Sequence, residues 1–488
     1  MSARPRAVDR AGWLAAAQSG ARLVALWGAD RRPQAGFAAC AAYVAGGRLE
    51  WVDLDLGAGE TYPALSPLFP HAARMERAVY DLVGLRAEGA ADERPWLDHG
   101  AWDRRFPLRA DAAPAESRAL DYPFVRVEGE GVHEIPVGPV HAGIIEPGHF
   151  RFSAVGEKVL RLEQRLGYTH KGIEKRFTEL GPLEAHRLAG RVSGDSTVAY
   201  AWAYCTALET AAATAPPPRA AWLRALALER ERVANHLGDL GALGNDATLV
   251  VGLTHFSRLR ETWQRRSREC FGHRFMMDFV VPGGTAADLD ATQLAAIARD
   301  CESLEREVGE LRTLYDEHAG LQDRFVTTGR VSAQLAARLG LTGLCGRASG
   351  QAVDLRPELA AEPYGALGVR MSTQKNGDVA ARVNLRFDEV FESLRLIRAI
   401  SVQLPGGAVR SAPAVPGAAA RGAGAVEGWR GEVLVALELD GGRIRRCHAH
   451  DPSWQNWPVL EHAVIGNIVP DFPLINKSFN LSYSGHDL

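Results

Sequence analysis

Six cysteines and a pair of histidines are the residues whose chemistry depends most on spacing. The cysteines lie at positions 40, 205, 270, 301, 345 and 447, and none forms a Cys-x-x-Cys pair. Neither a disulfide framework nor a thiolate metal site is indicated, so we expect reduced, buried thiols. His448 and His450 would share one face of a strand, but a metal site needs further ligands that the spacing does not supply.

Alternating apolar stretches in the first 110 residues predict a small sheet. Residues 22–27, 37–44 and 49–54 have the pattern of strands, and residues 72–85 have the pattern of a helix. A run rich in Ala, Pro and Glu at 111–117 then indicates a linker.

The middle of the chain predicts a packed helical bundle. Prolines at 216–218 are typical of a helix start, and apolar residues spaced by threes and fours follow them. The same spacing over about 292–315 predicts a second long amphipathic helix. Further on, a Gly/Ala/Pro-rich stretch at 405–424 predicts an exposed loop, and residues 432–448 predict a β-hairpin.

These elements predict an α+β protein of more than one domain. The chain has 488 residues, and a single core rarely grows past about 250–300. We expect an N-terminal α+β domain over residues 1–115 and a linker over 116–135. A large, mainly helical domain with small β-sheet additions would follow over 136–488.

Composition and charge narrow the class of partner. The net charge is -3, with acidic and basic residues interspersed, which gives no reason to expect nucleic acid as a partner. No apolar run reaches the roughly 18–20 residues that cross a bilayer. We therefore expect a cytoplasmic chain with no direct membrane span. The sequence also has no glycine-rich nucleotide-binding loop.

Several segments in a fixed order resemble a known pair of proteins. Residues 69–84 and 102–109 are similar to the small hydrophilic subunit of complex I. From about Pro136 the chain resembles the large subunit of group 4 nickel–iron hydrogenases, of the formate hydrogenlyase type, and its complex I counterpart. The matching stretches are 138–141, 146–152, 168–175, 228–237, 347–350 and 377–382.

In hydrogenases of this family, two Cys-x-x-Cys pairs hold a nickel–iron centre. The matching positions here are Ser193 with Ser196, and Ser453 with Asn456. A serine hydroxyl does not ionise near neutral pH and an amide is neutral, whereas nickel favours thiolates. The resemblance therefore implies a chain that has lost its metal ligands, so nickel and the reaction of hydrogen are not expected.

The resemblance also implies a frame around the lost site. Its residues are Arg191, Asp195, Arg347, Ser349 and Asp451. Two interpretations remain open. One is a reworked pocket that binds a quinone or another acceptor, or that holds a fixed relay of charges. The other is a filled vestige whose polar residues satisfy one another. Residues 468–488 continue beyond the second position pair, and we expect an extended tail that plugs or lines the space.

Two further residues could handle protons. Glu146 stands where the hydrogenases place an acidic residue that exchanges protons with the metal thiolates, and burial would raise its pKa. The alternative is an ion pair with an arginine such as Arg151. His141 lies in a Gly-Pro-x-His loop that approaches the quinone headgroup in complex I. However, Gly194 stands where the complex I pattern has a tyrosine, which argues against a quinone site of that type.

The segment from His170 to Lys175 begins a helix near the iron–sulfur partner in the family. The resemblance places His170, Lys171 and Glu174 at that partner interface, and a solvated helix start is the alternative.

The expected function is that of a large subunit in a membrane-associated complex that couples electron transfer to ion translocation. The expected partners are an iron–sulfur small subunit, which carries the clusters, and membrane-embedded ion-translocating subunits. No cofactor is assigned to this chain itself, apart from a possible quinone. The complex would lie on the inner face of the cell membrane. Two alternatives remain: an oxidoreductase that reduces a quinone or small acceptor, and a non-catalytic protein that only couples the other subunits.

Overall fold

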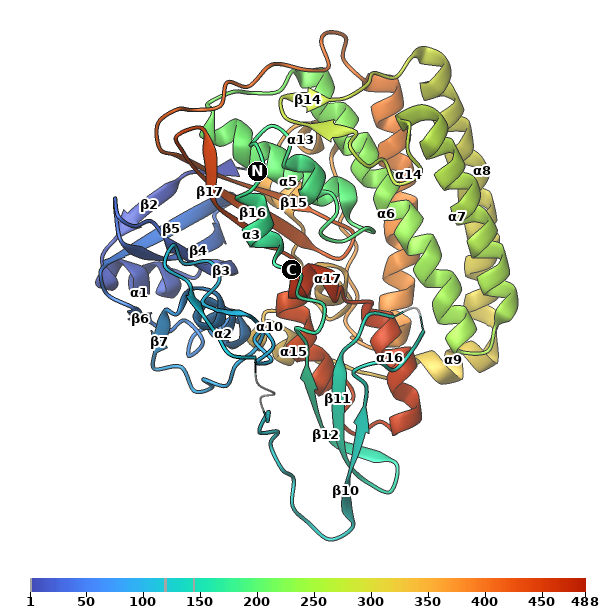
Figure 1. The fold of residues 1–488 in the computed structure, drawn as a ribbon. Helices are drawn as coiled ribbons and strands as arrows, with labels where there is room; N and C mark the ends of the chain where they lie inside the picture. The colour runs from blue at the N-terminus through green and yellow to red at the C-terminus, as the bar shows by residue number, and fades with distance from the viewer. Residues whose placement is uncertain (1, 118–120, 144) are drawn as a thin grey trace.

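The computed structural model describes residues 2–117, 121–143 and 145–488. A small α+β unit lies on one side and a bundle of long helices on the other, with an antiparallel sheet between them (Figure 1). The predicted α+β class is confirmed, because the sheets of the described residues are small and most of the long helices gather in one bundle.

The N-terminal unit is a four-stranded sheet in the order β2-β5-β4-β3, covered by α2. The three predicted strands and the predicted helix are confirmed. Helix α2 ends at Gly84, whose φ of 76° suits a residue without a Cβ. The elements are β2 (Pro5–Val8), α1 (Arg10–Gln18), β3 (Arg22–Asp30), β4 (Phe37–Ala45), β5 (Arg48–Gly57), β6 (Thr61–Pro63), α2 (Ala72–Val83), β7 (Arg86–Glu88), β8 (Arg104–Arg105) and β9 (Ala113–Pro114).

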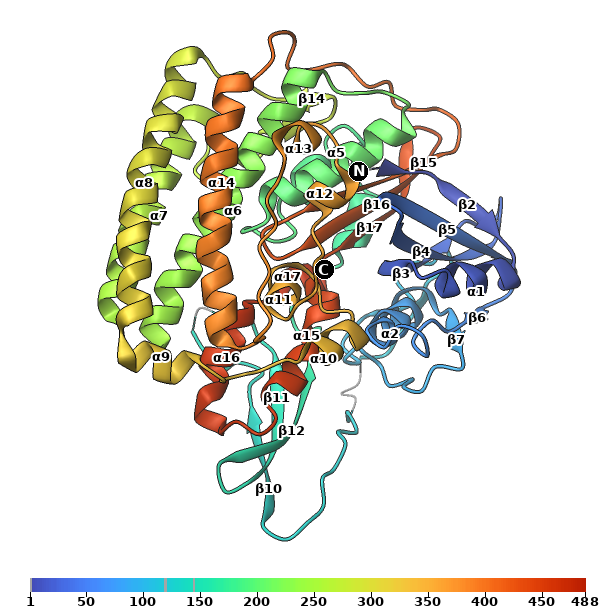
Figure 2. The same ribbon diagram turned by 180° about the vertical axis from the view of Figure 1, so that it is seen from behind.

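The bundle is built around α6, which packs against α7 and α14, while α8 covers α14 (Figures 1 and 2). Both predicted long helices are confirmed. Gly244 and Gly252 let the Tyr315 ring lie between α6 and α7, since a Cβ at either glycine would meet its hydroxyl within 2.3 Å. The long helices are α5 (Thr197–Ala211), α6 (Pro218–Asp246), α7 (Val250–Phe271), α8 (Ala291–Glu317) and α14 (Val379–Gln403).

The central sheet has the order β1-β15-β16-β17. The predicted hairpin is confirmed as β16 (Glu432–Asp440) and β17 (Arg443–His450). The loop predicted over 405–424 is wrong at its end, because β15 (Ala420–Glu427) begins inside it. Gly422 and Gly424 lie against α5, where a Cβ would come within 2.4 Å of backbone oxygens. Glycines that indicated flexibility therefore serve close packing.

A second sheet of three antiparallel strands projects from the body of the molecule (Figure 1). Its strands are β10 (Val132–Val137), β11 (His149–Val155) and β12 (Lys158–Arg165). The linker predicted over 116–135 is therefore too long, since β10 begins within it. Residues 118–120 of that linker lie outside the described residues.

The C-terminal segment is mostly helical, and the extended tail predicted for 468–488 is wrong. Pro473 lies in the first turn of α16, where a proline fits a helix, so it starts the helix instead of favouring extended chain. The elements are α15 (Ser453–Ala463), η1 (Val469–Asp471), α16 (Phe472–Phe479) and α17 (Ser484–Asp487).

Short elements connect these parts. They are β1 (Ser2–Ala3), α3 (Ile173–Phe177), α4 (His186–Ala189), β13 (Val280–Val281), β14 (Gly284–Thr285), α9 (Ala319–Phe325), α10 (Ala333–Arg338), α11 (Gly343–Ala348), α12 (Leu355–Leu359) and α13 (Tyr364–Leu367). Strand β1 pairs with β15, so the first residues of the chain join the central sheet.

The hydrophobic cores cross the predicted domain boundary. One core holds Trp13 and Met75 of the N-terminal unit together with Trp454 and Trp457 of α15.

All six cysteines are buried and free, as expected. None of the helices in the described ranges is long and apolar enough to cross a membrane.

Candidate functional site

The two position pairs singled out in the sequence meet at the C-terminal segment. Ser193 Oγ donates to Asp195 Oδ1 at 2.8 Å and lies 3.0 Å from Ser482 Oγ. The backbone N–H of Ser482 donates to Ser453 Oγ at 2.9 Å. Ser482 thus bridges the two pairs, and we call Ser193, Asp195, Ser196, Ser453 and Ser482 the serine cluster.

An arginine fixes the carboxylate of this cluster. The two terminal nitrogens of Arg430 donate to Asp195 at 2.8 and 2.5 Å, and Ser196 Oγ donates to the same carboxylate at 3.3 Å. Burial alone would raise the pKa of Asp195, but the Arg430 guanidinium and the two hydroxyls lower it to about 2. Asp195 is therefore a fixed anion at neutral pH and not a proton carrier.

Asp451 and Asn456 are engaged by the surrounding protein. Asp451 accepts hydrogen bonds from the Tyr200 hydroxyl at 2.9 Å and from the Ser453 N–H at 2.8 Å. Asn456 pairs with the backbone of Thr342, accepting from its N–H at 3.1 Å and donating to its carbonyl at 3.3 Å. The segment over Asp451 is closely packed, because a Cβ at Gly485 would lie 2.5 Å from Asp451 Oδ2.

Arg347 and Ser349 belong to a different buried region. Arg347 donates to Glu389 and Glu427 at 2.7 and 2.8 Å. Burial opposes ionisation of Glu389, yet Arg347 and His236 hold the pKa of that carboxyl well below its usual range. Ser349 is fully buried, and its hydroxyl has no hydrogen-bond partner among the described residues. This network holds α11 and α14 against β15.

Arg191 does not face the serine cluster with its guanidinium. Its nitrogens bind Asp278 at 2.7 and 2.9 Å, and 44% of its side chain is exposed. The frame expected from the sequence therefore reduces here to Asp195 and Asp451, because the side chain of Arg191 turns outward to a surface carboxylate.

The two proton-handling candidates lie beside the C-terminal segment. Glu146 is exposed and accepts from the Ser484 N–H at 3.0 Å, so the burial expected for it is absent. Arg151 binds Glu134 instead, at 3.1 Å. His141 is half-buried against Phe150 and near Tyr483, and burial lowers its pKa.

The three residues expected at a partner interface divide between surface and interior. Lys171 is exposed, and His170 Nδ1 lies 2.7 Å from the Asp487 carbonyl. Glu174 is buried, with Arg446 at 3.1 Å and His448 at 2.6 Å. Burial opposes ionisation of Glu174, but these two partners lower its pKa to about 2. The Glu174 carboxylate is enclosed by β17 and is not offered to a partner, while the interface assignment of this segment stays a prediction.

Three residues near the cluster were not singled out from the sequence. Arg430 and Ser482 lie in segments without a matched motif. Glu231 lies inside the matched stretch 228–237, among charges typical of a helix surface, but it is buried. Its carboxyl accepts from the N–H groups of Val198 and Ala199 at 2.7 and 3.2 Å, and burial raises its pKa to about 8. Leu228 and Ala234, one helical turn before and after Glu231, were the only signal of that burial.

An open cavity of about 490 Å³ adjoins the serine cluster on the bundle side. Asp195, Asn235, Arg260, Glu261, Lys477 and Asn480 are among its lining residues. One third of the Asp195 side chain is exposed, so the cluster has an edge that solutes can reach.

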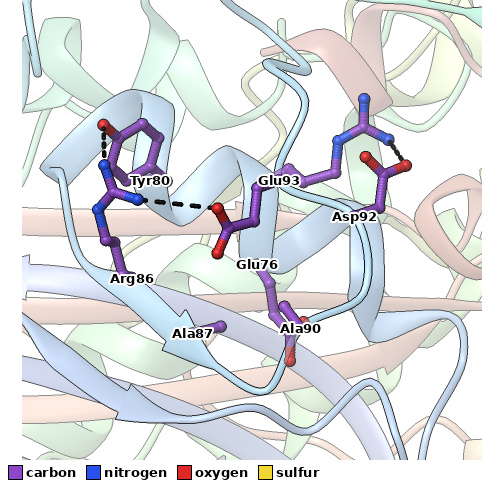
Figure 3. A pocket seen from close by; sticks show the side chains of 8 residues that line it. Glu76, Tyr80, Arg86, Ala87, Ala90, Asp92 and Glu93 are labelled. Atoms are coloured by element: carbon purple, nitrogen blue, oxygen red, sulfur yellow. Dashed lines mark hydrogen bonds and ion pairs between the residues drawn. The ribbon is translucent and has the colours of Figure 1, made fainter.

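A second pocket lies on the N-terminal unit between α2 and β7 (Figure 3). Its volume is about 40 Å³, which leaves room for water but for little else. Glu76 accepts from two backbone N–H groups at 2.6 and 2.9 Å, and Arg86 lies 3.8 Å from Glu93. Glu76 thus ties residues 65 and 66 to α2, and the small volume leaves no room for a substrate.

Comparison with known proteins identifies the class. Residues 4–118 match the family described as respiratory-chain NADH dehydrogenase, 30 Kd subunit, and residues 246–416 match its 49 Kd subunit. The chain is 32% identical over 446 residues to formate hydrogenlyase subunit 5 of Escherichia coli, covering 89% of this chain and 78% of that protein. The chain therefore belongs to the family of fused small and large subunits that includes this protein.

Two further relatives and one solved structure are also similar to this chain. The fused C/D protein of the NADH-quinone oxidoreductase of Bacteroides thetaiotaomicron is 26% identical, over 78% of this chain and 76% of its own. Membrane-bound hydrogenase subunit alpha of Pyrococcus furiosus is 26% identical, over 69% of this chain and 83% of that protein. A chain of the membrane-bound sulfane sulfur reductase, an archaeal respiratory membrane complex, shares the fold with a TM-score of 0.68. The two are 23% identical in sequence, and the match covers 74% of this chain and 99% of that chain.

Proposed function

We propose that this chain is the large subunit of a membrane-associated complex that couples electron transfer to ion translocation without a nickel–iron centre. The relatives are subunits of hydrogenases and of NADH-quinone oxidoreductase, which supports the general kind. In this proposal an iron–sulfur small subunit supplies the clusters, and membrane-embedded subunits move the ion. The complex would lie on the inner face of the cell membrane.

The serine cluster carries the proposal. A nickel–iron centre needs deprotonated thiolates, whereas the four matched ligand positions, at residues 193, 196, 453 and 456, offer three hydroxyls and one amide. Each of the four side chains already has a hydrogen-bond partner in the protein. Ser482 also fills the space between the pairs, so these residues do not fit the metal group of the family.

The site would then contribute fixed charge and rigidity in place of metal chemistry. Asp195 and Arg430 form a partly buried, bidentate ion pair, which holds the start of α5 to the loop after β15. Glu231, below the same helix start, keeps its proton at neutral pH. A proton-binding carboxyl beside a fixed anion can respond to a partner's charge, which a coupling role requires.

The test is purification of the tagged chain from its own host. We expect it to fractionate with membranes and to bring many-helix subunits and an iron–sulfur protein with it, and to contain iron without nickel. Recovery of the chain alone from the soluble fraction would contradict the assignment to a membrane complex.

A second candidate is reduction of a quinone or small acceptor, favoured by the open cavity beside Asp195 and by His141 at the C-terminal segment. Under this candidate the purified complex reduces a quinone or sulfur acceptor, and turnover falls in Glu146→Gln or His141→Ala. Unchanged turnover in both variants would favour a coupling role without chemistry in this chain.

A further inference from the structure

An open cavity of about 570 Å³ lies away from the serine cluster, against the β11–β12 face. Its walls include Tyr122, Phe124, His149, Arg151, Arg165 and Tyr168. Residues 121–131 run to β10 (Figure 1), and this segment supplies Tyr122 and Phe124.

The strand register brings three cationic or basic side chains to one face. His149 of β11 is paired with Arg165 of β12 across the sheet. Arg151 follows His149 by two residues, so it projects from the same face of β11. The cavity is therefore a built feature of the sheet and not a chance gap between loops.

Arg165 is a buried cation without a counterion. It is only 3% exposed, and no carboxylate of the described ranges forms a salt bridge with it. Its Nη2 donates to the Asp98 carbonyl at 3.1 Å, while its Nη1 has no partner. Burial lowers its pKa. Removing an ion from water without a partner is costly, so such a group is normally paired.

The contact from Arg165 to His99 does not supply a hydrogen-bond acceptor for the guanidinium. His99 Nε2 lies 2.8 Å from the Leu166 carbonyl, which requires a proton on that nitrogen. A protonated Nε2 is no acceptor, so it gives nothing to Arg165 Nε at 3.3 Å. One backbone carbonyl is then the standing acceptor for a guanidinium with five N–H donors.

A second guanidinium, that of Arg151, lines the same cavity. Arg151 Nε is also buried without a hydrogen-bond partner in the described part of the chain, whereas His149 Nδ1 donates to the Gly138 carbonyl at 3.4 Å, which leaves Nε2 of that neutral ring an acceptor. The Arg165 guanidinium lies 4.0 Å from the centre of the Tyr122 ring, and that of Arg151 lies 4.5 Å from the centre of the Phe124 ring. Aromatic faces thus hold both guanidinium planes in position, which reduces the entropy lost when a ligand binds.

We propose that this cavity binds a small oxyanion, a carboxylate or a phosphate, through the guanidinium groups of Arg165 and Arg151, which line it. Planar guanidinium groups match both anions. Arg126, Arg151 and Arg165 outnumber the two lining carboxylates, Asp121 and Glu134, which gives the walls a net positive charge. The site is separate from the serine cluster and does not depend on the function proposed for it.

The experiment is calorimetric titration of the purified complex, or of the full chain, with sodium phosphate and with sodium benzoate at matched ionic strength. We expect saturable binding of one anion per chain, with half-saturation below about 5 mM. The tighter of the two anions indicates whether the natural ligand is a phosphate or an aromatic carboxylate. Arg165→Gln is expected to weaken binding at least about tenfold, which is the loss of one charged hydrogen bond.

Arg176→Gln is the matched control, since it removes the same charge from an exposed helix position, 66% accessible, outside the cavity. Absence of saturable binding of both anions, or equal affinity in Arg165→Gln and Arg176→Gln, would overturn the proposal. If Arg165→Gln fails to fold, Arg151→Gln takes its place under the same criterion, because Arg151 is 31% exposed and tolerates replacement better.

Discussion

The serine cluster and the arginine cavity are both polar, but they differ in how far their hydrogen bonds are satisfied. In the cluster, Ser193, Asp195 and Ser453 are each bonded to the chain itself, and Ser482 closes the space between them. In the cavity, Arg165 and Arg151 keep donors without a partner in the described part of the chain, and the two residues line about 570 Å³ of open volume. Residue type alone does not distinguish a filled site from a site that can bind a ligand. The two are distinguished by whether their hydrogen-bond donors already have partners within the chain.

The largest effect is expected from breaking the cluster's ion pair. Asp195→Ala leaves the Arg430 guanidinium buried without its carboxylate, which we expect to cost about 3–4 kcal/mol in the free energy of unfolding, somewhat reduced because Asp195 is partly exposed. Urea unfolding followed by circular dichroism measures it. Asp278→Ala is the control, since it removes a surface partner of Arg191 and is expected to cost less than about 1 kcal/mol. Equal losses in the two variants would show that the cluster is not a closed structural unit.

A smaller effect is expected in the pH dependence of stability. The pKa of Glu231 is raised to about 8, so the folded chain binds this proton more tightly than the unfolded chain does. The stability it contributes is present below the unfolded pKa and is lost as pH rises towards 8. Between pH 6 and 8 the wild-type chain is expected to lose about 2–3 kcal/mol relative to Glu231→Gln.

The matched control is Glu174→Gln, whose wild-type pKa lies near 2, below this pH range. Glu174→Gln is expected to differ from the wild type by the same amount at pH 6 and at pH 8. A Glu231→Gln curve parallel to the wild-type curve over this range would mean that Glu231 is ionised throughout.

The smallest effect tests how tightly the C-terminal segment fills the cluster. Gly485→Ala places a Cβ against Asp451, and overpacking of this kind costs roughly 1–3 kcal/mol, so we expect about 1.5. Gly181→Ala is the control, because a Cβ there meets open space. Thermal unfolding compares them. Equal melting temperatures would mean that the segment leaves room over Asp451.

The sequence predicted the fold better than the site. Periodicity located β3, β4, β5, α2, α6 and α8, because their apolar residues repeat along one element. It failed at β15, where small residues serve close contact with α5, and at α16, where a proline starts a helix. Both elements depend on the residues that pack against them from elsewhere in the chain, and a local sequence pattern does not show those residues.

Within the site, the four ligand positions were found because a resemblance fixed their order along the chain. The burial of Glu174 was not predicted because its partners, Arg446 and His448, come from a strand more than 270 residues away. The resemblance also placed Arg191 in the frame. Its guanidinium instead binds Asp278 at the surface, and this partner lies 87 residues away in the sequence. Long-range ion pairs decide such side chains, and sequence spacing does not reveal them.

The most direct test of the central claim is metal analysis of the complex purified from its own host, together with a hydrogen assay. Serine and asparagine at positions 193, 196, 453 and 456 predict less than about 0.1 nickel per chain, and no evolution or uptake of hydrogen that depends on this chain. One nickel per chain, or hydrogen turnover abolished by changing Ser193 and Ser453, would contradict the account.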